Sequence, residues 1–161
     1  IGYAGTDYDT YLTNLSNQKI SYAKFDSDYV AKYKENKTPF EEVMKDVEKL
    51  FGLKMSGAQD DKRVLTEYEV GLLKDAYEKT IADEKADEDN QEEYVLYGTY
   101  EPLSVTITHL LNNKSGIDFS SYSHTGLPVA VFAKGVGQEN FGGYYDNTQI
   151  YHKLADLMDI Q

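Results

Sequence analysis

The sequence has 161 residues, enough for one domain, and carries a net charge of −12 from 28 acidic and 16 basic side chains. This acidity, with no basic stripe, disfavours nucleic-acid binding, and no apolar run approaches the roughly 20 residues that span a bilayer. Hydrophobic residues make up 40% of the chain, so it can bury a core, while the lack of cysteine excludes disulfides, thiolate metal ligands and a cysteine nucleophile.

The first segment, from Ile1 to Gly5, is typical of a strand interior. Because the chain starts without a methionine, we expect it to be a piece of a longer protein. No regular element is predicted from Thr6 to Phe25, where tyrosine, asparagine and serine show no clear period. A short helix is expected over residues 27–35.

Two helix starts share one capping pattern, a threonine followed three residues later by glutamate. At the first, Thr38 precedes Pro39, and apolar residues then recur at three- and four-residue steps until Gly52. At the second, Thr66 precedes a stripe that runs to Ala82. These patterns predict helices over 39–51 and 66–82, separated by a loop around 56–61.

An acidic run over 83–93 is interpreted as solvated surface or a helix end, because it lacks the alternating ligands and central glycine of a calcium loop. A helix is predicted over 102–113, followed by strands over 117–122 and 127–133. A final helix is expected after Thr148, with a buried face formed by Ile150, Leu154, Leu157 and Met158. The expected fold class is α+β, mainly helical with a small sheet.

Histidine is the natural candidate for metal binding or acid–base chemistry. We interpret His109 and His152 as ordinary helix residues, whereas His124 lies in a polar junction between two predicted strands, where a site and a plain surface position are equally plausible. No second metal ligand stands at a diagnostic spacing, and no nucleophile elbow, phosphate-binding loop or dinucleotide fingerprint is present. The 15 tyrosines are interpreted as half-buried aromatic surface.

The carboxy-terminal third carries a specific series of residues. The segment from His124 to Gly135, followed by Phe141-Gly142-Gly143 and by residues 145–150, resembles the end of a bacterial alkaline phosphatase. Residues 110–117 also resemble this family, and residues 1–5 resemble the strand that follows its Asp-His ligand motif. The resemblance implies a parent enzyme with a three-layer α/β/α sandwich. Residues 1–161 would be a single C-terminal domain or fragment, and residues 26–113 a helical insertion within it.

The resemblance also implies a function. The parent would hydrolyse phosphate monoesters through a phosphoserine intermediate, with two zinc ions per subunit and possible magnesium, and His124 would be a zinc ligand. No Asp-Ser-Ala nucleophile segment occurs here, so we expect no catalytic residue in this chain, no tight metal binding and no activity in isolation. The implied partners are the rest of the parent chain and a second subunit, and the implied location is periplasmic or extracellular.

Two alternatives stay open. The chain could be a stand-alone acidic, tyrosine-rich binding or interaction module. The parent could also belong to the same superfamily but cleave a phosphodiester or a sulfate ester, because the residues that select the substrate lie largely outside this sequence.

Overall fold

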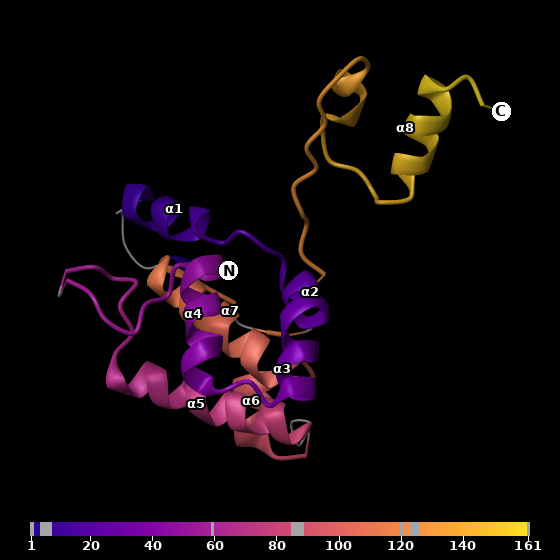
Figure 1. The fold of residues 1–161 in the computed structure, drawn as a ribbon. Helices are drawn as coiled ribbons and strands as arrows, with labels where there is room; N and C mark the ends of the chain where they lie inside the picture. Colours follow the sequence, from indigo (N-terminus) through magenta and orange to yellow (C-terminus); the bar gives the residue numbers. More distant parts are fainter. Residues whose placement is uncertain are drawn as a thin grey trace. The chain divides into compact units, whose positions relative to one another are not determined.

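The fold is described from a computed structural model, which places residues 2–3, 8–58, 60–84, 89–119, 121–122 and 126–160 (Figure 1). The chain divides into two compact units, residues 1–122 and 123–161. The first contains β1 (Gly2–Tyr3), α1 (Tyr8–Ser16), α2 (Tyr22–Phe25), the π-helix η1 (Asp26–Val30), α3 (Ala31–Asn36), α4 (Phe40–Phe51), α5 (Glu67–Ala82), α6 (Gln91–Tyr97), α7 (Pro102–Lys114) and β2 (Ile117–Asp118). The second contains the 3-10 helix η2 (Gln138–Phe141) and α8 (Gln149–Leu157).

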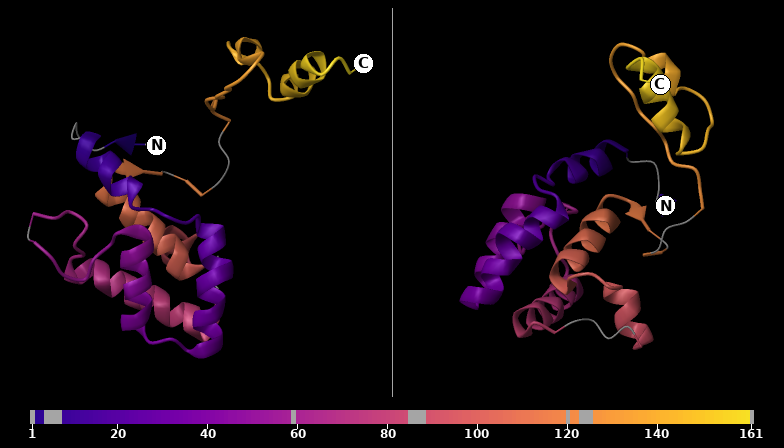
Figure 2. Two further views of the ribbon diagram at one scale, coloured as in Figure 1. Left: turned by 45° about the horizontal axis from the view of Figure 1, so that its top comes forward. Right: turned by 90° about the vertical axis from the view of Figure 1, so that its right-hand side faces the viewer.

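Most described residues of the first unit are helical, which confirms the expectation of a mainly helical chain (Figure 2). Helix α7 packs against α1, α2, α4, α5, α6 and β2, so it is the central helix of this unit. Leu103, Ile107 and Leu111 of α7 are fully buried, and they join a core that includes Val43, Val47, Phe51 and Leu73. Burial of this apolar surface is the main source of stability for the first unit.

The predicted helices over 39–51 and 66–82 are confirmed as α4 and α5, but only one of the two capping predictions holds. Thr66 and Glu69 form the full capping box at α5. At α4 the N-cap residue is Pro39, and no side chain caps the helix, so the box predicted at Thr38 is wrong. Gly52 ends α4 in a left-handed conformation, at φ 76°, as its position predicted.

The expectation for residues 6–35 needs correction. Two helices, α1 and α2, occupy part of the segment for which no regular element was predicted. The predicted helix over 27–35 is part of a longer helical run that begins at Tyr22, is capped by Ser21 and passes through η1 into α3. The buried ring of Phe25 packs on Tyr33 and Phe51, so core contacts extend the helix beyond its local pattern.

The helix predicted over 102–113 is confirmed as α7, with Pro102 in its first turn. Helix α6 begins within the acidic run, where Asn90 accepts hydrogen bonds from the amides of Glu92 and Glu93. Glu93 also pairs with Lys79 at 2.7 Å, so this end of the run contributes to packing between helices. Residues 85–88 of the run lie outside the described part of the chain.

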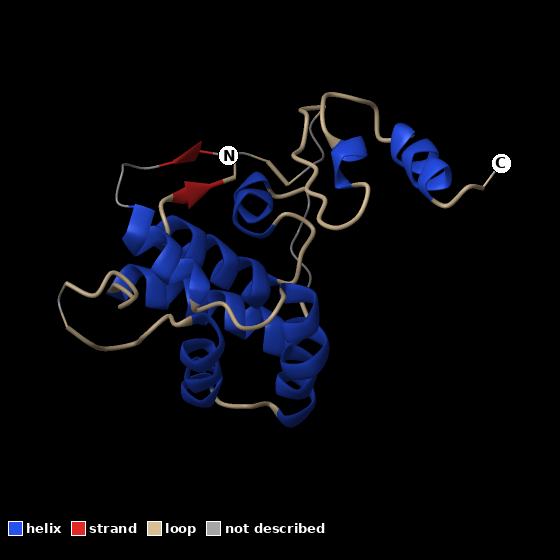
Figure 3. Cartoon of the chain, turned by 90° about the horizontal axis from the view of Figure 1, so that it is seen from above, coloured by secondary structure: helices blue, strands red, loops and turns tan. Residues whose placement is uncertain are grey.

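The predicted strands are mostly absent from the described residues. Gly2 and Tyr3 pair antiparallel with Asp118 and Ile117, which places a short strand at the start of the chain, where one was expected (Figure 3). The predicted strand over 117–122 is therefore reduced to two residues. Residues 127–133 form no strand at all, because no other described segment pairs with their backbone.

The second unit has little core of its own. In its described part, Ala155 is the buried apolar side chain of α8 and Ile150 is partly buried, whereas Leu154, Leu157 and Met158 are exposed. The predicted buried face is therefore wrong at three of its four positions. Gly137 has a φ of 80°, and a Cβ there would come within 2.4 Å of Leu157. The Leu157 side chain therefore packs against the backbone of Gly137, which connects α8 to η2. Most apolar side chains in the described part of the unit are still exposed to solvent.

Candidate functional site

The candidate metal ligand, His124, lies outside the described residues, as do Ser123 and Thr125. The structure therefore leaves its predicted role untested. It does describe Tyr122, two residues earlier in the chain, whose side chain lies in a well-defined setting in the first unit.

The hydroxyl of Tyr122 lies within hydrogen-bond distance of three groups. The carbonyl oxygens of Val95 and Leu96 lie 2.9 Å and 3.0 Å away, and Nε2 of His109 lies 3.2 Å away. A phenol has one proton to donate, so it donates to a carbonyl and accepts from Nε2–H of His109 when the imidazole is neutral with its proton there. These contacts connect Tyr122 to both α6 and α7.

The ring of Tyr122 is also held by aromatic neighbours. Its centroid lies 5.9 Å from Tyr94, 5.8 Å from Tyr100 and 5.6 Å from His109. Gly98, at φ 58°, leaves room for the ring, because a Cβ there would approach Tyr122 Cγ to 2.8 Å. We call these five residues, Tyr94, Gly98, Tyr100, His109 and Tyr122, the Tyr122 anchor.

Burial favours the neutral forms of two side chains in the anchor, His109 and Tyr122. Burial, together with the neighbouring phenols of Tyr94 and Tyr100, raises the pKa of Tyr122 to about 12. Burial also lowers the pKa of His109, although the negative charge of Asp118 acts to raise it. A neutral phenol and a neutral imidazole therefore share the hydrogen bond between α7 and Tyr122.

His152, on α8, has a different environment from His109 on α7. His152 is exposed, and its ring contacts only the neighbouring ring of Tyr151 among the contacts described, with centroids 5.3 Å apart. His109 is half-buried in α7. Both positions agree with their interpretation as ordinary helix residues.

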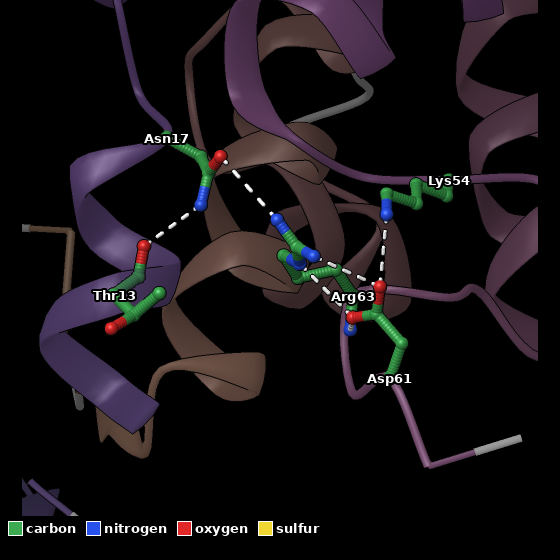
Figure 4. Close-up of polar contacts among 5 residues, drawn as sticks. All are labelled: Thr13, Asn17, Lys54, Asp61 and Arg63. Carbon is green, nitrogen blue, oxygen red and sulfur yellow. Dashed lines mark hydrogen bonds and ion pairs between the residues drawn. The ribbon is translucent and has the colours of Figure 1, made fainter. Parts of the chain in front are cut away.

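A second polar cluster lies in the loop between α4 and α5 (Figure 4). The Asp61 carboxylate accepts from Nζ of Lys54 at 2.9 Å, and from Nε and Nη2 of Arg63 at 3.0 Å and 2.9 Å. Arg63 also reaches the side chain of Asn17, which donates to the carbonyl of Thr13 in α1. We interpret this cluster as structural, because the Asp61 carboxylate pairs with both cations, Lys54 and Arg63, and Arg63 ties the loop to α1 through Asn17.

The described residues also form an open cavity of about 650 Å³ beside η1, α3 and α4. Its lining carries charges of both signs, from Asp28, Lys32, Glu42, Lys45 and Asp46. Lys45 pairs with Glu42 at 2.5 Å, and Tyr33 donates to Asp46 at 2.7 Å. With three carboxylates against two lysines, the cavity lacks the concentrated positive charge that would hold a phosphate group.

No group of three or more histidine, aspartate or glutamate side chains is placed to hold a metal ion within the residues that the structure describes. In the same residues no helix is long and apolar enough to cross a membrane. A donor set for zinc requires three or four converging ligands, and His124 is a single imidazole. This chain by itself therefore offers one predicted ligand for zinc, and we derive no catalytic step through the metal.

Comparison with known families supports the resemblance seen in the sequence. The family model for alkaline phosphatase matches residues 31–160, which is most of the chain and includes parts of both compact units. The chain therefore belongs to the alkaline phosphatase family, and this membership supports a phosphatase-like function at the level of the family. No curated protein and no solved structure gave a match.

Sequence reasoning missed the Tyr122 anchor and the Asp61 cluster. Tyr122 belongs to a general surplus of tyrosines, and the partners of its ring come from residues 94–109, so no local pattern marks it. Asp61 and Arg63 are two residues apart, and this spacing was a usable signal for a local ion pair. Their connection to α1 through Asn17 was not visible in the sequence.

Proposed function

We propose that this chain is the C-terminal part of an alkaline-phosphatase-like zinc enzyme that hydrolyses phosphate monoesters, and that His124 is one of its zinc ligands. The observation that carries the proposal is the family match, which runs through the His124-Thr125-Gly126 segment and on to residue 160. In this proposal residues 26–113 are a helical insertion. The parent has an α/β/α sandwich, forms a homodimer and is exported.

A neutral imidazole suits zinc, but a catalytic zinc needs three protein ligands and a position for water or substrate. The nucleophile and the remaining ligands are therefore supplied by the rest of the parent chain, and we expect the isolated chain to be inactive. Two bound zinc ions would supply activation of a serine nucleophile and stabilisation of the leaving oxygen, and the His124 imidazole would help to hold one of them. The contribution of this chain is to hold the His124 imidazole at a fixed place.

The second unit gives independent support for a larger parent. Leu127, Val129 and Phe132 are 73%, 84% and 92% exposed, and apolar residues occupy both alternating sides of residues 127–133. A run of this kind is typical of a strand buried on both faces of a sheet. We propose that residues 127–133 pair with the sheet of the parent enzyme, immediately after His124.

The test replaces His124 by alanine in the complete enzyme. We expect His124→Ala to reduce zinc content and to lower the hydrolysis rate of p-nitrophenyl phosphate by at least about 100-fold. The reason is that the zinc ion would lose one of the ligands that fix its coordination geometry. The control is His152→Ala, because His152 is exposed and lies on α8. Normal zinc content in His124→Ala, measured by elemental analysis, would refute the assignment.

The same preparation tests the substrate class. We expect the complete enzyme to prefer p-nitrophenyl phosphate over bis-p-nitrophenyl phosphate and p-nitrophenyl sulfate. A clear preference for the diester or the sulfate would keep the zinc proposal but replace the substrate.

A further inference from the structure

We propose that the open cavity beside η1, α3 and α4 binds a small organic cation of the polyamine class. We call it the Tyr33 cavity, after the buried tyrosine in its lining. Its volume of about 650 Å³ lies within the range of about 300–1,000 Å³ that is usual for small-molecule sites. All of its lining residues lie in the first unit and in the described part of the chain, and none of them takes part in the proposed phosphatase chemistry.

Negative charge exceeds positive charge in the lining of the Tyr33 cavity. Of its two lysines, Lys45 pairs with Glu42 at 2.5 Å, so these two charges compensate each other. The exposed Lys32 then remains against two carboxylates, those of Asp28 and Asp46. The whole chain carries a charge of −12, which also raises the local concentration of cations. A cationic ligand therefore suits this cavity better than an anionic one.

The carboxylates of Asp28 and Asp46 are both able to accept hydrogen bonds from a ligand. Asp46 accepts from the Tyr33 hydroxyl at 2.7 Å, and Asp28 accepts from the Ser27 hydroxyl at 2.9 Å. Neither carboxylate forms an ion pair with a lysine or an arginine in the part of the chain that the structure describes. An ionised carboxylate offers about four acceptor positions, so most of these positions stay open. An ammonium group would supply both the opposite charge and several N–H donors.

Two aromatic rings, those of Tyr29 and Tyr33, form the apolar part of the lining. Their centroids lie 6.3 Å apart, and both rings pack on the fully buried Phe25, which holds them in place. Burial, followed by the Asp46 carboxylate, raises the pKa of Tyr33, so the phenol stays neutral and donates its proton to Asp46. Aromatic rings attract ammonium groups within about 6 Å of the ring centroid. The lining thus combines carboxylates with aromatic rings, which together recognise an alkylammonium chain.

The acidic side chains of the cavity suit separate ammonium groups better than one metal ion. Asp28 lies in η1, whereas Glu42 and Asp46 lie in α4. Among the described residues no three histidine, aspartate or glutamate side chains are placed to hold a metal ion, which needs oxygen ligands converging to about 2.0–2.6 Å. A linear polyamine carries its charges several bonds apart, so it can reach carboxylates on different elements and place its methylene groups against the rings.

The experiment is isothermal titration calorimetry of spermidine into the complete protein at low ionic strength. The buffer contains zinc and an excess of magnesium, so that metal sites are occupied and compact divalent cations compete for any general acidic surface. We expect spermidine to bind with a Kd below about 1 mM. The absence of binding under these conditions would overturn the proposal.

Two variants remove a carboxylate from the lining. Asp28→Asn and Asp46→Asn should each weaken spermidine binding by about 5–10-fold, because a charge-assisted hydrogen bond is lost. Asparagine keeps an oxygen that can accept from Tyr33, so Asp46→Asn should retain the fold. The matched control is Glu48→Gln, since Glu48 is exposed on the same helix and lies outside the lining. It should change spermidine binding by less than about 2-fold.

A third variant tests the sign of the ligand's charge. Lys32→Met keeps a long unbranched side chain but removes a positive charge from the lining, so it should tighten spermidine binding by about 3-fold. Lys49→Met is its control, because Lys49 is exposed on α4 outside the lining, and it should have little effect. Unchanged or weaker binding in Lys32→Met would place spermidine elsewhere and overturn the proposal.

The carboxylate variants provide the most direct refutation. If Asp28→Asn and Asp46→Asn both bind spermidine within about 2-fold of Glu48→Gln, binding reflects only the overall acidity of the chain, and the proposal fails. Circular dichroism checks that each variant is folded. If Asp46→Asn does not fold, Asp28→Asn decides, because the described hydrogen bond of Asp28 is to its neighbour Ser27.

Discussion

At the scale of single residues, Asp61 shows how a charge can organise a loop. Its carboxylate accepts hydrogen bonds from the Arg63 side chain, the Arg63 backbone amide and Lys54. These bonds hold the pKa of Asp61 well below its usual value, with Arg63 as the largest cause. Because the side chain is 19% exposed, solvent screens the cluster only in part.

Replacing Asp61 by asparagine should destabilise the chain by about 1–2 kcal/mol at pH 7, because charge-assisted hydrogen bonds are lost. The native pKa lies below that of the unfolded chain, so the unfolded state takes up the proton first as the pH falls. The stabilisation is therefore complete above about pH 5 and is lost progressively below about pH 4. Urea unfolding across this range measures the difference between the two proteins.

The matched control is Asp60→Asn, because Asp60 is an exposed neighbour. It should stay within about 0.5 kcal/mol of wild type at pH 7. A stability difference between wild type and Asp61→Asn that stays constant from pH 7 to pH 2 would contradict the electrostatic explanation.

At the scale of elements, the two threonine patterns have different outcomes for a physical reason. Thr66 has no competing role and caps α5. The amide of Thr38 donates to the Tyr33 carbonyl at the end of α3, and its own carbonyl accepts from Tyr77. Thr38 therefore belongs to the end of one helix, and α4 begins one residue later at Pro39.

This difference predicts unequal effects of the same substitution. Thr66→Ala should cost about 1 kcal/mol, the usual value for a lost N-cap. Thr38→Ala should cost less than about 0.5 kcal/mol, because α4 has no side-chain cap to lose. Urea unfolding of both variants checks the prediction, and equal losses would contradict it.

The central position of α7 leads to a second prediction at this scale. Ile107 is fully buried, whereas Leu12 on α1 is 64% exposed. Ile107→Ala should destabilise the first unit by about 2–5 kcal/mol, and Leu12→Ala should change its stability by no more than about 0.5 kcal/mol. Thermal unfolding followed by circular dichroism distinguishes the two, and a small loss for Ile107→Ala would place the core elsewhere.

At the scale of the whole molecule, the two units should differ in local stability. Helix α7 lies in a continuous core, whereas α8 buries little apolar surface in its own unit. In the isolated chain, amides of α7 should therefore exchange with deuterium at least about 100-fold more slowly than those of α8. Hydrogen exchange with mass spectrometry measures both, and equal protection would indicate a core in the second unit.

The sequence predicts the helices that have a strong local apolar period, and it fails for those held mainly by contacts with distant residues. Helices α4, α5 and α7 follow strong apolar periods, and their predicted bounds agree with the structure to within one or two residues. Helix α1 has no such period. One tertiary contact that holds it is the bond from the Asn14 side chain to the Lys114 carbonyl, 100 residues away. Local propensity cannot anticipate such a contact.

The prediction of a strand over 127–133 and the prediction of a metal site at His124 were limited for other reasons. Residues 127–133 have strand-forming side chains, but a strand needs a neighbour, and no described segment supplies one. His124 was singled out through resemblance to a family, since a lone histidine in a polar junction does not specify a metal site. The Tyr122 anchor depends on contacts between separate helices and became visible only in the folded chain.

If this chain is the C-terminal part of a larger phosphatase, as we propose, the native product is much longer than 161 residues. The most direct test is the size of the native product, measured with an antibody raised against the chain on denatured extracts of the source cells. We expect a band several times heavier than 18.3 kDa, the mass of the 161 residues. A single band at 18.3 kDa would contradict it, since His124 would then have no partner ligands from a parent enzyme.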